Sequence, residues 1–233
     1  MLYITGDLHG DKSTIRGYLD TLKETTKDDI LIIAGDFGLP WWSPLTSYWK
    51  NYKDVKLLKL LADGPFTTCF IDGNHENFNQ LAKYPLEEKW GGLVQNIEGC
   101  YHLMRGEIYT METSRIFTFG GATSTDKEWR TPKLSWWPQE VCSEEERIHA
   151  IDKLNACNWE VDYVITHTAP KQFKSLYKKA LSTKNEPCET ADFLTEIYKK
   201  IIYKCWYFGH FHDDISDNNL KARLIYNDIV EMK

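Results

Sequence analysis

Histidine, aspartate and asparagine recur in this chain at one kind of position, just after an apolar, strand-like run. Five polar segments follow such runs: Gly-Asp-Leu-His-Gly at residues 6–10, Gly-Asp-Phe-Gly at 35–38, Gly-Asn-His-Glu at 73–76, Thr-His-Thr at 166–168 and Gly-His-Phe-His at 209–212. Strand ends at one edge of an α/β sheet converge in space, so we expect the five segments to form a single site. This recurrence constrains the fold more than any other feature of the sequence.

The rest of the chain alternates strand-like runs with helical periodicity. Apolar runs predict strands at residues 1–5, 30–34, 66–71, 161–166, 204–208 and 223–226, and a short turn predicts a hairpin of residues 107–111 and 115–119. Apolar spacing predicts helices near residues 13–25, 48–61, 173–181 and 194–201. A capping box at Ser143 and Glu146 predicts a further helix, with Ile148, Ile151 and Leu154 on one face. This pattern predicts an α/β protein of two packed sheets flanked by helices.

The chain shows no repeat, low-complexity tract or linker, so its 233 residues predict a single domain over residues 1–233. One long irregular insertion interrupts the pattern. Residues 122–140 are polar, rich in tryptophan and contain Pro132 and Pro138. We call this segment the tryptophan-rich loop, and long loops within compact domains are often functional.

Composition restricts the partners that we expect. The chain has 28 basic and 34 acidic residues and a net charge of −6, which disfavours an extended nucleic-acid surface but allows a local pocket for one phosphate. Neither a secretory signal pattern nor an apolar run of membrane-spanning length is present, so we expect a cytoplasmic protein that does not engage a membrane. The six cysteines are scattered, which predicts reduced thiols, several of them in the core.

The donor types in the five segments predict a metal centre. Five of the seven histidines fall in these segments, and Asp7, Asp36 and Asn74 occupy equivalent positions. Burying so many polar groups without ions or partners would be costly. Imidazole, carboxylate and amide ligands suit two divalent ions, Mn²⁺ or iron (Fe²⁺/Fe³⁺) first and Zn²⁺ as a further candidate. Two ions about 3.5–4 Å apart can clamp a phosphate and activate a bridging water for in-line attack.

The motifs, taken in order, resemble those of the calcineurin-like metallophosphoesterase superfamily. Asp-x-His, Gly-Asp, Gly-Asn-His-Glu, a lone histidine and Gly-His-x-His extend from Asp7 to His212, nearly the whole chain. The resemblance implies two stacked mixed β-sheets flanked by helices, a four-layer α/β/β/α sandwich. It also implies hydrolysis of a phosphate ester or phosphoanhydride by a two-metal site.

The resemblance further implies a role for each residue of the site. His75 would stay off the metals and act as the general acid that protonates the leaving oxygen, with Asp7 or Asp36 supporting its charge. Histidine suits this task because its unperturbed pKa of about 6.5 is close to neutrality. The implied metal ligands are Asp7, His9 and His212 for the first ion, Asn74, His167 and His210 for the second, and Asp36 as the bridge.

Residues 6–10 are similar to the opening of the serine/threonine phosphoprotein phosphatases, but two phosphate-gripping arginines of that group are missing. Asp36 is followed by Phe-Gly-Leu-Pro instead of continuing to Asp-Arg-Gly, and Asp72 stands before Gly-Asn-His-Glu in place of arginine. A guanidinium fork is hard to replace. We therefore expect a small nucleotide or phosphodiester substrate. A phosphomonoesterase, including a protein phosphatase, is the alternative, and a catalytically silent scaffold is the alternative outside enzymes.

Candidate substrate contacts are a loop arginine and two tryptophan pairs. Among the loop cations Lys127, Arg130 and Lys133, we expect only Arg130, beside Trp129, to replace a missing arginine. The tryptophans have two interpretations, an aromatic wall that stacks a base or rings that only pin the loops. The pairs are Trp41 with Trp42 and Trp136 with Trp137. We predict structural roles for Cys100, His102 and His149.

Overall fold

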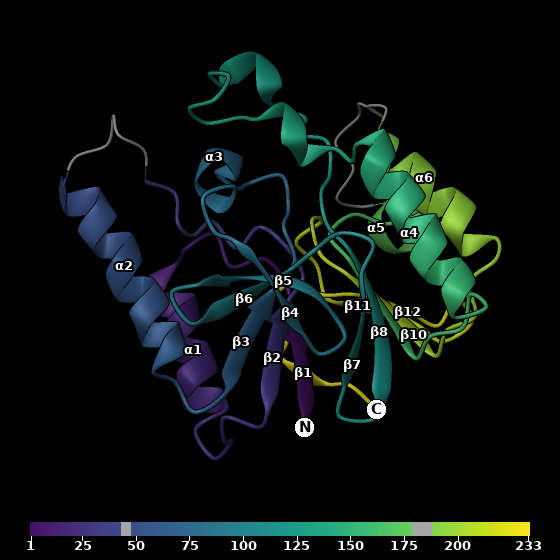
Figure 1. The fold of residues 1–233 in the computed structure, drawn as a ribbon, viewed down its shortest axis with the longest axis horizontal. Helices are drawn as coiled ribbons and strands as arrows, with labels where there is room; N and C mark the ends of the chain where they lie inside the picture. The colour runs from purple at the N-terminus through teal and green to yellow at the C-terminus, as the bar shows by residue number, and fades with distance from the viewer. Residues whose placement is uncertain (43–47, 179–187) are drawn as a thin grey trace.

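The protein is built from two β-sheets stacked face to face, with helices covering the outer face of each (Figure 1). The structure, a computed structural model, describes residues 1–42, 48–178 and 188–233. On the first sheet lie α1 (Lys12–Thr21) and α2 (Tyr48–Ala62), and on the second lie α4 (Glu144–Ala156), α5 (Lys174–Tyr177) and α6 (Glu189–Tyr198). The short α3 (Phe78–Leu81) follows the third strand.

Both sheets contain parallel and antiparallel neighbours. Seven strands of the described residues form the first sheet, in the order β13 (Val230–Glu231), β1 (Leu2–Thr5), β2 (Ile30–Ile33), β3 (Thr67–Phe70), β6 (Cys100–Leu103), β5 (Gly92–Ile97) and β4 (Leu86–Lys89). Six form the second, in the order β11 (Ile215–Asp217), β12 (Ala222–Leu224), β10 (Cys205–Phe208), β9 (Tyr163–Thr166), β8 (Ser114–Phe119) and β7 (Ile108–Met111). The central strands are parallel, and their carboxyl ends carry the five polar segments.

Three apolar clusters separate the four layers. Ile4, Ile32 and Ile165 lie in the cluster between the two sheets and are fully buried. A second cluster joins the first sheet to α1 and α2, and a third joins the other sheet to α4, α5 and α6. Strands covered on both faces need apolar residues at consecutive positions, which is why all four residues of β2 are apolar and buried.

The predicted architecture of two packed sheets flanked by helices is confirmed, but several local predictions were wrong or incomplete. Strands β4, β5, β6, β11 and β13 were not predicted. For β4 the reason is that it is an edge strand whose residues are mostly exposed and polar. Helix α1 ends at Thr21, four residues before its predicted end at residue 25. In α4 the predicted capping box is present, but Ile148 and Ile151 are 53% and 38% exposed, and the helix buries Ala150 and Leu154 instead.

The tryptophan-rich loop contains two short 3₁₀ turns, Lys127–Trp129 and Pro138–Glu140. It leads into a segment that a buried arginine holds in place, since Arg105 donates to the carbonyls of Gln139 (2.8 Å) and Val141 (3.1 Å). The six cysteines are free thiols as predicted, three of them buried. Among the described residues, no helix combines the length and apolar character that crossing a bilayer requires. Part of the predicted helix at 173–181 lies outside the described residues.

Candidate metal centre

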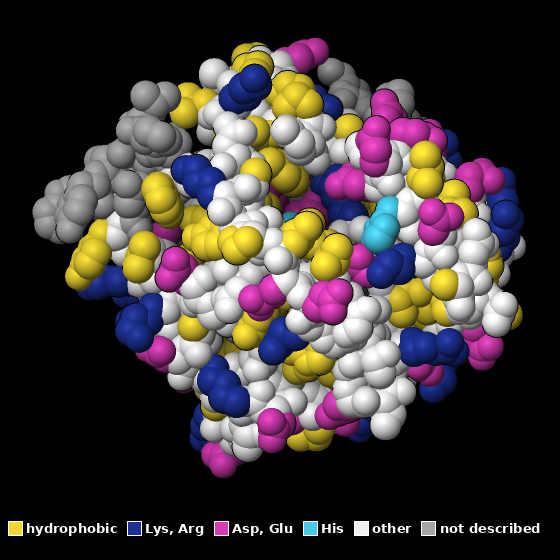
Figure 2. Space-filling view, in the orientation of Figure 1, with side chains coloured by type: hydrophobic (Ala, Val, Ile, Leu, Met, Phe, Trp, Pro, Cys, Tyr) yellow, Lys and Arg dark blue, Asp and Glu magenta, His cyan; other side chains and the backbone are white. Residues whose placement is uncertain are grey.

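The five polar segments meet where β1, β2 and β3 of the first sheet end beside β9 and β10 of the second. Figure 2 shows a hollow on the molecular surface, bordered by hydrophobic side chains, in which a histidine and acidic side chains are visible. Two sets of side chains offer ligand atoms that all lie within 4.8 Å of one another. These sets are Asp7, His9 and His212, and Asp7, Asp36 and His167.

Asp36 lies between the two halves of the site, with one carboxylate oxygen facing each. Its Oδ2 is 3.8 Å from His9 Nε2, and its Oδ1 is 3.2 Å from His167 Nε2. The residue is 2% exposed. Burial opposes ionisation of Asp36, but His167, His75 and His9 outweigh it and hold the pKa of this carboxyl well below its usual range. A buried carboxylate facing two imidazole groups in this way is suited to bridging two cations.

Asp7 is the second buried carboxylate of the site. Its Oδ1 accepts the backbone N–H of His210 (3.0 Å). Its Oδ2 is buried and makes no hydrogen bond among the described residues, although His212 Nε2 lies 3.0 Å away and His9 Nε2 3.9 Å away. A buried carboxylate oxygen without a hydrogen bond is costly unless a cation compensates it.

His167 and Asn74 form the other half of the site. The Nδ1 of His167 lies 2.9 Å from the carbonyl of Ala34, which fixes the ring and leaves Nε2 free to face Asn74 Oδ1 at 3.1 Å. The amide nitrogen of Asn74 donates to Ser124 Oγ (3.0 Å), and that hydroxyl donates to Glu140 Oε2 (2.7 Å). This chain of hydrogen bonds turns the amide oxygen of Asn74 toward the centre.

The neighbouring histidines His167 and His210 respond oppositely to their surroundings. Burial opposes charging of His167, but Asp36 and Asp7 outweigh it and raise its pKa to about 10. Burial together with the neighbouring His167 lowers the pKa of His210 to about 4. The rings of His167 and His210 are 5.0 Å apart. The centre thus combines two carboxylates that attract cations with a neutral imidazole, the form that ligates metals.

The backbone of the site is strained in a consistent way. Four candidate ligands have positive backbone φ angles, which residues other than glycine rarely adopt. They are His9 (50°), Asp36 (45°), His210 (69°) and His212 (50°). A Cβ at Gly73 would lie 2.1 Å from Asp36 Oδ1, so only glycine lets the backbone approach this carboxylate. Together with the buried Asp7 oxygen that faces His212 and His9, these features fit a site built to hold a pair of cations.

His75 lies at the edge of the centre and reaches it through its backbone. Its N–H donates to Asp36 Oδ1 (2.7 Å), and its ring is 5.1 Å from that of His9. Burial lowers the pKa of His75, Asp36 opposes this shift, and Arg130 adds to it. Arg130 Nη2 lies 2.8 Å from His75 Nε2, and Asp126 holds the guanidinium at 2.8 Å. The structure therefore places the predicted arginine of the loop at the predicted general acid.

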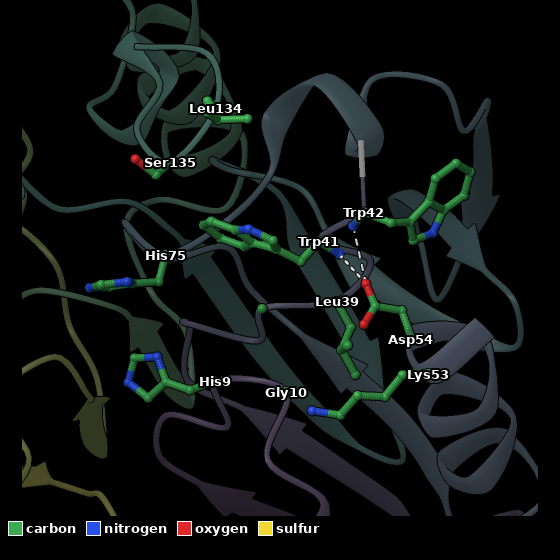
Figure 3. A pocket seen from close by; sticks show the side chains of 11 residues that line it. His9, Gly10, Leu39, Trp41, Trp42, Lys53, Asp54, His75, Leu134 and Ser135 are labelled. Carbon is green, nitrogen blue, oxygen red and sulfur yellow. Dashed lines mark hydrogen bonds between the residues drawn. The ribbon is translucent and has the colours of Figure 1, made fainter. Parts of the chain in front are cut away.

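A pocket of about 640 Å³ adjoins the centre, and His9 and His75 belong to its lining (Figure 3). Trp41 and Trp42 also line it. The other predicted tryptophan pair is not among the described lining residues: Trp137 is 2% exposed and packs perpendicular to Trp41 at 5.5 Å, and Trp136 lies under the ammonium of Lys127. The two pairs thus differ, because Trp41 and Trp42 line the pocket whereas Trp137 is buried and packs against Trp41.

Asp72 stands where the phosphoprotein phosphatases that residues 6–10 resemble have arginine, and its side chain contacts Arg105 and His102 in the core. Burial opposes its ionisation, but Arg105 and His102 hold its pKa well below the usual range. Arg105 Nε donates to Asp72 Oδ2 (2.9 Å), and its Nη1 donates to Glu146 (3.0 Å). His102 lies 3.3 Å from Asp72, His149 lies 2.9 Å from Glu107, and Cys100 is buried, which agrees with structural roles for these residues.

Three supporting residues were not assigned from the sequence. The carboxylate of Glu76 accepts the N–H groups of Phe37 (2.7 Å), Gly38 (3.0 Å) and Gly73 (3.3 Å), and so ties together the turns that carry Asp36 and Asn74. Burial, reinforced by the charges of Asp36 and Asp72, raises the pKa of Glu76. The position of Glu76 at the end of the Gly-Asn-His-Glu motif could have identified it as a supporting residue from the sequence. Ser124 and Glu140 had none, because no local pattern in the loop indicates which residues reach Asn74.

Comparison with known proteins places this geometry in a family. No curated protein matches the chain. A family model described as calcineurin-like phosphoesterase matches residues 2–214, which include all five polar segments and every strand of both sheets except β11, β12 and β13. The predicted resemblance and the predicted fold of two mixed sheets flanked by helices are thereby confirmed. The chain belongs to the calcineurin-like phosphoesterase family.

Proposed function

We propose that the chain is a dinuclear metal-dependent phosphoesterase that hydrolyses a small phosphodiester or nucleotide. The observation that carries the proposal is the position of Asp36, whose two carboxylate oxygens face separate groups of imidazoles at 3.8 and 3.2 Å. Family membership supports the reaction class. The preference for diesters rests on position 72, where the resembled phosphatases have a phosphate-gripping arginine and this chain has Asp72. Asp72 accepts a hydrogen bond from Arg105, so position 72 supplies no guanidinium for the dianion of a monoester.

The roles that we propose follow the geometry. Two divalent ions, Mn²⁺, iron or Zn²⁺, would supply Lewis acidity and an activated water nucleophile. His75 would hold the proton for the leaving oxygen, Asp36 would fix the backbone of His75 by accepting its N–H, and Arg130 would pair with a non-bridging phosphate oxygen. The proposed ligands are Asp7, His9 and His212 for the first ion, Asn74, His167 and His210 for the second, and Asp36 for both.

Turnover of paired model substrates tests the function. We expect purified protein loaded with Mn²⁺ to hydrolyse bis-p-nitrophenyl phosphate with a higher kcat/KM than p-nitrophenyl phosphate. Metal analysis of the same sample should give two ions per chain. A strong preference for the monoester would favour the phosphomonoesterase alternative, and metal binding without turnover of either ester would favour the silent scaffold.

Arg130→Ala is expected to lower kcat/KM for bis-p-nitrophenyl phosphate by roughly 10- to 100-fold, mostly through KM, because it removes a charge-assisted hydrogen bond to phosphate. Arg130→Lys should recover only part of the loss, since an ammonium cannot reproduce the guanidinium fork. The exposed Lys133 of the same loop provides the matched control, and Lys133→Gln should leave both constants unchanged. Equal losses in the two loop variants would mean that only the general charge of the loop matters.

Ser124→Ala is expected to weaken binding of Mn²⁺ by roughly 10- to 100-fold, because Asn74 loses the partner that orients its amide. Saturating Mn²⁺ should restore most of the activity, since the proposed ligand itself remains. Titration with Mn²⁺, followed by both bound metal and turnover, measures the shift. Ser216→Ala, at an exposed position of β11, serves as the control. An activity loss that Mn²⁺ cannot restore would contradict the orienting role.

A further inference from the structure

The pocket beside the centre has a defined direction. In Figure 3, His9 and His75 lie together at one end of the pocket, Leu134 and Ser135 of the tryptophan-rich loop lie on one side, and Lys53 of α2 lies on the other. In Figure 3 the indole of Trp41 extends toward His75, whereas that of Trp42 points the opposite way. The pocket therefore leads away from the reacting centre along the Trp41 ring.

His75 indicates which part of a substrate this pocket would receive. A general acid must lie within hydrogen-bonding reach of the oxygen that it protonates, directly or through one water. In the proposed reaction that oxygen belongs to the leaving group, so the leaving group must begin at His75. The pocket that starts at His75 is consequently on the leaving-group side of the scissile bond. Its volume of about 640 Å³ is that of a small-molecule site.

Trp41 is held rigidly at this position. Its backbone N–H and that of Trp42 donate to the same oxygen of Asp54, at 2.8 and 3.1 Å. Its carbonyl accepts a hydrogen bond from Asn77 (3.0 Å), and its indole packs perpendicular to the buried Trp137. A ring that is fixed before binding loses little conformational entropy when a ligand stacks on it. Such a surface selects flat aromatic groups of many kinds.

We propose that this pocket binds the leaving group of the substrate and that this group carries a flat aromatic ring, from a nucleoside or an aryl alcohol, which stacks on Trp41. The inference rests on the proposed function, because it uses His75 as the general acid. Lys53, whose side chain points toward Gly10 in Figure 3, adds a cation that suits an anionic substrate. Trp41 is then a specificity-determining residue.

Competition between matched phosphates tests the inference. Adenosine 5′-monophosphate, phenyl phosphate and ribose 5-phosphate share a phosphate but differ in the group attached to it. We expect both ring-bearing ligands to inhibit hydrolysis of bis-p-nitrophenyl phosphate more strongly than ribose 5-phosphate, the adenosine ester by roughly 5- to 100-fold. A clear advantage of the adenosine ester over phenyl phosphate assigns the pocket to nucleosides, and near equality assigns it to aryl groups. Quenching of tryptophan fluorescence by each ligand gives a readout that does not depend on turnover.

Trp41→Ala should bring the inhibition constants of the ring-bearing ligands close to that of ribose 5-phosphate, so that their ratio is nearly one. The inhibition constant of ribose 5-phosphate itself should not change. Trp129→Ala is the matched control, because Trp129 is 88% exposed and should keep the wild-type discrimination. Equal inhibition by all three ligands would overturn the inference, and so would discrimination that survives in Trp41→Ala. Neither result would affect the proposed function as long as the wild type still hydrolyses the ester. Loss of the proposed function itself would be recognised separately, by absence of both Mn²⁺ binding and hydrolysis in the wild type.

Discussion

Replacing His75 with alanine is expected to lower kcat by roughly 10²- to 10⁴-fold for esters of weakly acidic alcohols, and much less for p-nitrophenyl esters. An alkoxide must receive a proton as it leaves, whereas p-nitrophenolate is stable without one. His75 is placed for this step because its N–H is fixed by Asp36 at 2.7 Å while its ring borders the pocket. Parallel kinetics on methyl and p-nitrophenyl esters of the same phosphate, with metal content measured in each sample, would check the expectation.

The matched control for this variant is another histidine of the same chain. His149 of α4 pairs with Glu107 at 2.9 Å, and the side chain of His149 is 40% exposed. His149→Ala should therefore retain activity on both the methyl and the p-nitrophenyl ester. His75→Ala should still bind two ions per chain, because the proposed ligands are untouched. An equal loss on both esters, or a loss of bound metal, would show that His75 supports the centre instead of donating a proton.

The convergence of the candidate metal ligands could be anticipated because it depends on strand ends. Asp7, Asp36 and Asn74 each lie within a few residues of an apolar run, and parallel strands carry such residues to one edge whatever the details of the intervening helices. Glycines at residues 73 and 209 marked the turns where backbone meets carboxylate. The edge strands were harder to detect, since β4 is exposed and buries no apolar face.

The loop residues could not be placed from the sequence, because no periodicity governs their path. Trp41 and Trp137 are the same residue type in two tryptophan pairs, yet one lines the pocket and the other is buried behind it. Arg130 was singled out from its neighbours, but its contact with His75 depends on the ion pair with Asp126 and on the course of the whole loop. Long-range contacts of irregular segments emerge only from the folded chain.

Asp36→Ala is expected to reduce bound metal from two ions per chain to at most one and to lower kcat/KM by roughly 10³-fold or more. The ions of a two-metal site together supply several kcal/mol of transition-state stabilisation, and about 1.36 kcal/mol corresponds to a tenfold change in rate. The two carboxylate oxygens of Asp36 face His9 in one half of the centre and His167 in the other, so this replacement should affect both ions. Elemental analysis and turnover with added Mn²⁺ measure the two losses.

Thermal unfolding separates loss of metal from loss of fold in this variant. Metal that binds only the folded wild type should stabilise it by about 2.7 kcal/mol at a free concentration of 100 times Kd, and so raise Tm. In Asp36→Ala this Mn²⁺-dependent rise should largely disappear, while a cooperative transition persists in the absence of metal. Asp63→Ala, which removes an exposed aspartate paired with Lys59 at 2.8 Å, should keep the full rise. If Asp36→Ala retained both the rise and two bound ions, the carboxylate would not bridge, and the division of the site into two halves around it would have to be abandoned.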